Sequence, residues 1–244
     1  MENRSTNLAY DNVTQINETD SSRKFLANVF LWMFVALGLS ALCAFYFATD
    51  TTLLSMLRDP ETGGNTGLGT VVMFAPLAFV LLISFGFNRL SYGVLLIAFI
   101  AFALVMGMSL SYILLAYTAS SVLGVFITAS VLFGVMAVAG YTTQQDLTKF
   151  GSILIMFLIG IVIASLVNMF LRSRGLDMII SYIGVAVFVG LTAYDVQKLK
   201  RIGAGLEYGD ASAKKMAIMG ALTLYLDFIN LFLMLLRVFG RRNN

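Results

Sequence analysis

Long runs of residues without a charge dominate this chain. From Leu90 to Gln145 no Asp, Glu, Lys or Arg occurs, and a helix of that length would extend about 84 Å, more than twice the roughly 30 Å hydrocarbon core of a bilayer. The segment "YTASS" at 117–121 is the natural place for a break. The runs are apolar at every position and not at every second one, which favours transmembrane helices over barrel strands.

This pattern predicts an all-α fold, a polytopic integral membrane protein built as a bundle of seven transmembrane helices. The predicted spans are about 25–49, 70–88, 92–117, 120–141, 150–171, 178–199 and 216–236, within one domain over residues 25–240. Residues 1–24 are polar and contain no apolar core, so we expect a disordered cytoplasmic tail there and not a cleaved signal peptide. Residues 241–244 form a short second tail.

Composition and charge agree with a membrane protein. Hydrophobic residues make up 59% of the chain and charged residues 12%, which excludes a soluble domain. Positively charged loops stay in the cytoplasm. With the N-terminus inside, ten Lys and Arg residues lie on the cytoplasmic side and six outside, so we predict a cytoplasmic N-terminus and an external C-terminus. The net charge of +3 is then explained by the Lys and Arg residues of the cytoplasmic loops, and no nucleic-acid partner is implied.

The sequence contains no histidine, and Cys43 is its one cysteine. These absences remove the usual zinc ligands and the usual pH-sensitive side chain. Any proton sensing must therefore use carboxylates. We expect no catalytic residues, no enzymatic activity and no bound cofactor.

Two aspartates lie inside predicted spans. Asp227 is 12 residues after Lys215 and 10 before Arg237, or about 18 Å and 15 Å of helix, which places it near the bilayer centre. Asp195 lies toward the cytoplasmic end of the sixth span. Because the sixth and seventh spans run antiparallel and are joined by a short loop, both carboxylates enter from the cytoplasmic side. We hypothesise that they meet and share a proton, since two like charges in a low-dielectric site do not both ionise cheaply.

An alternative is that Asp227 stays protonated, donates one hydrogen bond to a carbonyl and serves only helix packing. An ionisable group inside a span costs at least about 2.5–3.5 kcal/mol, which favours an ion or proton pathway instead. Asn230 shares the face of Asp227 and Tyr194 precedes Asp195, so both are candidate supporting polar groups. Asp195 and Asp227 are also the candidate calcium ligands, with water or backbone carbonyls completing the shell.

Arg89 lies in the turn "FNRLSYG" between the second and third spans, on the same predicted side as Asp195. It is a candidate cation partner of that carboxylate. An ordinary role as a positive-inside anchor explains it equally well.

Three segments carry a resemblance to a known family: "GYTTQQDLTKFG" (140–151), "AYDVQKL" (193–199) and "ALTLYLDFINLFLMLLRVFG" (221–240). They resemble the Bax inhibitor 1 family, also called TMBIM, and the match extends over roughly residues 25–240. The resemblance implies a pH-sensitive calcium leak channel or transporter of a bacterial inner membrane, with the seventh helix central. It implies that Asp195 and Asp227 form the di-aspartyl pH sensor and that Arg89 stands at the latch position. Lipid, protons and calcium as the transported ion would be its partners.

Two other classes of membrane protein share some of these features. Intramembrane aspartyl proteases also carry two membrane aspartates, but they need G-x-G-D on the second helix, and here "LYL" precedes Asp227. This disfavours a protease. The alternative that stays open is a membrane-embedded regulator that binds a membrane quality-control protease, with the polar tail at 1–24 as the docking segment.

Overall fold

The computed structural model describes residues 2–206 and 210–243, and the side chains from residue 20 onward within those ranges. The described chain is helical, with two isolated backbone bridges and no strand. Its helices are α1 Glu2–Thr49, α2 Thr51–Leu57, α3 Gly67–Gly86, α4 Tyr92–Ala116, α5 Ala119–Thr142, α6 Thr148–Leu171, α7 Arg174–Ala204 and α8 Ala211–Phe239. Seven of these helices, all except α2, are long and apolar enough to cross a membrane. The predicted all-α, seven-span fold is confirmed.

The two ends of the chain differ from the simple tails that the sequence predicts. Residues 2–24, expected to be disordered, continue α1 in one helix to Thr49. At the other end, residues 241–243 are held against the turn between α4 and α5, where the Thr118 backbone N–H donates to the Arg241 carbonyl at 2.9 Å and the Asn243 N–H to the Ala116 carbonyl at 2.9 Å. Met1 and Asn244 lie outside the described residues.

The short helix α2 occupies the connection between the first two predicted spans, where no helix is predicted. It begins after Asp50, whose carboxylate accepts hydrogen bonds from the backbone N–H groups of Thr52 (2.8 Å) and Leu53 (3.1 Å). An aspartate at this position satisfies N–H groups that have no partner within the helix. The same bonds lower the pKa of Asp50, with the Leu53 N–H as the largest cause.

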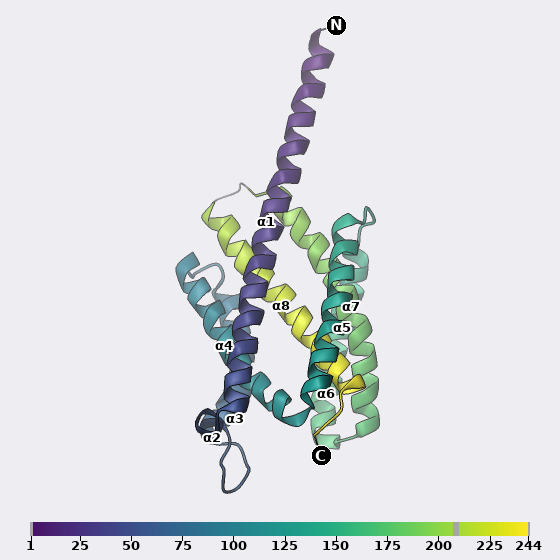
Figure 1. Ribbon diagram of the computed structural model, residues 1–244. Coiled ribbons are helices and arrows are strands. Elements are labelled where there is room, and N and C mark those ends of the chain that lie inside the picture. The colour runs from purple at the N-terminus through teal and green to yellow at the C-terminus, as the bar shows by residue number, and fades with distance from the viewer. Residues whose placement is uncertain (1, 207–209, 244) are drawn as a thin grey trace.

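Helix α8 lies at the centre of the bundle. In its most apolar 18-residue stretch 72% of the residues are buried, against 11% in the corresponding stretch of α6. It packs against α1, α4, α5 and α7, and it crosses the bundle diagonally (Figure 1). The expectation that the seventh span is central is confirmed.

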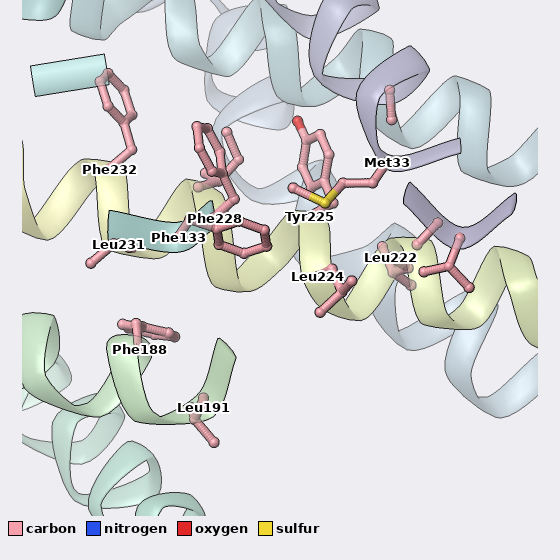
Figure 2. Close-up of a cluster of buried hydrophobic side chains, with 14 of the residues drawn as sticks. Met33, Phe133, Phe188, Leu191, Leu222, Leu224, Tyr225, Phe228, Leu231 and Phe232 are labelled. Atoms are coloured by element: carbon pink, nitrogen blue, oxygen red, sulfur yellow. The ribbon is translucent and has the colours of Figure 1, made fainter. Parts of the chain in front are cut away.

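Apolar side chains leave α8 in several directions (Figure 2). Leu224 and Leu231 point toward α7, whereas Tyr225 points to the opposite side. Phe228 packs edge-to-face against Phe133 of α5, with ring centroids 5.6 Å apart. Contacts with α1, α4, α5 and α7 on these different sides hold α8 in the core of the bundle.

Gly140 brings the backbone of α5 against that of α7. A Cβ atom built at Gly140 would meet the carbonyl oxygen of Ala193 and lie 2.8 Å from its Cα and carbonyl carbon. Small residues allow such close approach between membrane helices. The contact fixes α7 two residues before Asp195.

Candidate functional site

The structure brings Asp195 of α7 and Asp227 of α8 together. Their carboxyl groups interact with each other, and the two residues are only 8% and 6% exposed. Asp195 lies about 14 Å from the end of α7 at Ala204, whereas Asp227 lies about 24 Å along α8 from Ala211. The two carboxyl groups can meet although these lengths differ, because α8 runs diagonally (Figure 1) and a tilted helix gains less depth in the bundle per residue. We call Asp195 and Asp227 the aspartate pair.

Little positive charge lies near the aspartate pair to balance its negative charge. The ion pairs of the described residues join Lys24 to Asp20, Arg201 to Asp146 and Arg237 to Asp177, and none includes the pair. Lys198, an exposed residue one turn along α7, acts on Asp195 only through its electrostatic field.

One oxygen of the pair, Oδ2 of Asp227, is buried and has no hydrogen-bond partner among the described residues. Two buried carboxylates without a paired cation do not both ionise cheaply. Such a pair can hold one proton between its two carboxyl groups.

Arg89 is not in contact with the aspartate pair in this structure. It is exposed in the turn after α3, where its backbone N–H donates to the Gly86 carbonyl at 2.9 Å. The same end of α3 touches the start of α8, since Lys215 Nζ lies 5.2 Å from the centre of the Phe87 ring. Arg89 thus lies on the face of the bundle where α7 ends and α8 begins, and its latch role stays a prediction.

The two candidate supporting residues lie in different surroundings. Asn230 is half-buried about one turn along α8 from Asp227, and no hydrogen bond within the described part joins it to the pair. The ring of Tyr194 lies against α6, where it would collide with a Cβ atom at Gly151. Tyr194 therefore faces α6 and does not belong to the surroundings of the pair, although it is next to Asp195 in sequence.

The oxygen ligands available for a cation are few. Within the described residues no cluster of three or more Asp, Glu, Cys or His side chains occurs. The aspartate pair offers at most four carboxylate oxygens, fewer than the six to eight that a resident calcium ion takes.

Gln197, which sequence reasoning did not single out, holds the connection between α5 and α6 against α7. It is 5% exposed, its Oε1 accepts from the Leu147 N–H at 2.9 Å, and its Nε2 donates to the Gln145 carbonyl at 2.7 Å. Lys200 adds a third link by donating to the Tyr141 carbonyl at 2.8 Å. The available signal was the motif at 140–151, whose backbone groups at Tyr141, Gln145 and Leu147 are the partners of these side chains.

The same connection contains an ion pair at the surface. Arg201 Nη1 lies 2.8 Å from Asp146 Oδ1 and 3.1 Å from the Thr148 hydroxyl. The pKa of Asp146 is lowered to about 2, first by the hydroxyl and backbone N–H of Thr148 and then by Arg201. This carboxylate is therefore ionised at neutral pH.

A second buried polar contact lies on the opposite side of α8. Tyr225 is fully buried, and its hydroxyl lies 2.7 Å from Ser40 Oγ of α1. Ser40 Oγ donates to the Ala103 carbonyl of α4 at 2.6 Å, so the Tyr225 hydroxyl is the donor to Ser40. These bonds fix α8 between α1 and α4 two residues before Asp227.

Comparison with known proteins places this arrangement among membrane proteins of bacteria. A family model described as "Inhibitor of apoptosis-promoting Bax1" matches residues 22–244. The chain is similar to the Inner membrane protein YbhL of Escherichia coli, with 47% identity over 219 residues, 89% of this chain and 92% of the relative. It is 42% identical over 233 residues to the uncharacterized protein RP147 of Rickettsia prowazekii, covering 95% and 96% of the two chains.

Proposed function

Since the chain belongs to the Bax inhibitor family and is an integral membrane protein, we propose that it is a pH-sensitive calcium leak channel of the bacterial inner membrane, with Asp195 and Asp227 as the pH sensor. The observation that carries the proposal is the aspartate pair itself: two interacting carboxyl groups, 8% and 6% exposed, one of them on the most buried helix. Burying two ionisable groups inside spans is costly, and this cost is usually associated with an ion or proton pathway.

Protons act on this site by changing the repulsion between α7 and α8. With one proton between the carboxyl groups, the two helices can stay in contact at Asp195 and Asp227. Loss of that proton leaves two negative charges that repel each other and that attract a divalent cation. Protonation therefore shifts an equilibrium between a closed and an open arrangement of α7 and α8. No step of this mechanism is catalytic, and calcium is the transported ion and not a cofactor.

Helix α8 is the element best placed to transmit this change. It contacts α1, α4, α5 and α7, so a shift at Asp227 changes packing on several sides at once. Arg89 would add a latch only if the turn between α3 and α4 approached the pair, which it does not do in this structure.

Calcium flux into liposomes tests the proposal. The purified protein is reconstituted in liposomes that contain a calcium-sensitive dye, and uptake is measured as the external pH is varied. We expect a pH-dependent flux that Asp195→Asn and Asp227→Asn alter. The matched control is Asp177→Asn, which removes a carboxylate from the other end of α7, where Asp177 pairs with Arg237 at 3.4 Å. This control should behave like the wild type.

Absence of flux at every pH would refute the channel. The function to test next would then be binding of a membrane-embedded protease, by asking whether removal of residues 1–24 abolishes co-purification of that protease. An effect of Asp177→Asn as large as that of Asp227→Asn would instead show that any carboxylate on α7 or α8 matters, and it would refute the specific role of the pair.

A further inference from the structure

A groove runs along α1 on the side that faces α5. Helices α1 and α5 both pack against α7 and α8 but hardly touch each other, and α8 is visible between them in Figure 1. Four neighbouring cavities follow this line from the N-terminal side of the bundle toward its middle. We call them together the α1–α5 groove.

The outer end of the α1–α5 groove is polar and basic. It is a cavity of about 570 Å³ bounded by α1, the connection between α5 and α6, and α7. Arg23, Lys200 and Arg201 line it together with hydroxyl and amide groups, and no Asp or Glu of the described part of the chain lines it. Asp146 engages one nitrogen of Arg201 from outside the cavity, which leaves a net positive charge at this end.

The rest of the groove is apolar. Cavities of about 240, 410 and 120 Å³ follow the polar one. Neighbouring cavities share lining residues, so they follow one another along α1. The shared residues are Arg23 and Tyr141, then Phe30 and Ala137, then Leu37, Ala41 and Phe126.

Small residues keep the apolar part open. A Cβ atom at Gly38 of α1 or at Gly134 of α5 would meet no atom within 4 Å, and both residues line the 410 Å³ cavity. From Phe30 to Ala41 the groove follows α1 for about 17 Å. That is about half of the roughly 30 Å hydrocarbon core, which is the depth of one leaflet.

We propose that the α1–α5 groove binds one anionic phospholipid, with its phosphate at Arg23, Lys200 and Arg201 and one acyl chain lying between α1 and α5. The groove has the same sequence of polar and apolar parts as a phospholipid, since a basic pocket at its outer end is followed by apolar cavities that extend as deep as one leaflet. Basic pockets between transmembrane helices recognise lipid phosphates by charge. A wholly apolar partner, such as a neighbouring helix, would leave the basic end without a counter-charge.

Native mass spectrometry of the purified protein tests this inference, with phosphatidylglycerol, phosphatidylethanolamine or glycerol phosphate added in separate arms. We expect one phosphatidylglycerol to be retained per chain in preference to phosphatidylethanolamine, and glycerol phosphate not to bind. Arg23→Gln should weaken retention about fivefold, the contribution of one basic residue near an anionic surface. Arg23 is exposed, and its hydrogen bond to another described side chain is the 3.4 Å bond to the Tyr141 hydroxyl, so we expect this change to leave the fold intact.

The groove itself is tested by filling it. Gly134→Leu should weaken retention by more than about tenfold, because the new side chain takes the place of at least two acyl methylene groups. Gly160→Leu is the matched control, since Gly160 of α6 is equally open and lines none of these cavities.

Four results would overturn the inference: equal retention of the two phospholipids, equal effects of the two leucine variants, binding of glycerol phosphate alone, or a dimer that only Gly134→Leu removes. None of these readouts depends on calcium flux, so this inference and the proposed channel fail or stand separately.

Discussion

Replacing Gly140 by alanine tests the contact that fixes α7 beside the aspartate pair. The added Cβ would lie 2.8 Å from the Ala193 Cα and carbonyl carbon, whereas ordinary contacts begin at 3.4 Å. The Ala193 carbonyl oxygen lies closer still to the new Cβ, so the two backbones would have to separate by more than about 0.6 Å. Overpacking of this kind costs about 1–3 kcal/mol, and each kcal/mol lowers the melting temperature of a chain of this size by roughly 2–4 °C.

Thermal unfolding of the purified protein in detergent measures this effect. Gly134→Ala is the control, because Gly134 lies on the same helix and a Cβ there meets nothing within 4 Å. Both variants gain the higher helix propensity of alanine, so the difference between them isolates the contact with Ala193. We expect Gly140→Ala to melt several degrees below Gly134→Ala and to change the pH profile of calcium flux. Equal melting temperatures would refute the account of how α5 positions α7.

Three further predictions concern polar contacts around the pair. Gln197→Leu leaves two backbone groups unpaired and should lower the free energy of unfolding by about 1 kcal/mol, measured by thermal unfolding. It should also speed proteolysis of the connection between α5 and α6, and unchanged proteolysis would contradict this prediction. Ser40→Ala should destabilise more than Tyr225→Phe in the same assay, because it alone leaves the buried Tyr225 hydroxyl without its partner. Asp146 should titrate near pH 2 by NMR, and Thr148→Val should raise that midpoint. Because folding lowers the pKa of Asp146, its contribution to stability is present above about pH 4 and is lost as the pH falls through 2.

The seven spans were predictable because each is an uninterrupted apolar run longer than a bilayer core requires. Helix α2 was not, since its seven residues Thr51–Leu57 are too short to carry a periodic signal and only the capping residue Asp50 indicates it. Residues 2–24 were expected to be disordered because they lack an apolar face, yet they continue α1. Hydropathy detects burial in lipid and says little about a polar segment that extends an existing helix.

The aspartate pair was predictable only in part. Each carboxylate stands out within its own apolar run, but their contact depends on the diagonal course of α8, which sequence spacing does not reveal. For Tyr194, adjacency in sequence was misleading, because Asp195 faces α8 whereas the Tyr194 ring faces α6. Gln197 is next to Lys198 in sequence, and only the fold shows that it is buried against the 140–151 motif.

The most direct test of the central claim is a double-mutant comparison of the pH dependence of calcium flux. If Asp195 and Asp227 titrate as one unit, Asp195→Asn and Asp227→Asn should each abolish the pH dependence, and the double variant should differ little from either single one. A pH dependence that survives in Asp227→Asn, or effects of the two substitutions that simply add, would contradict the account.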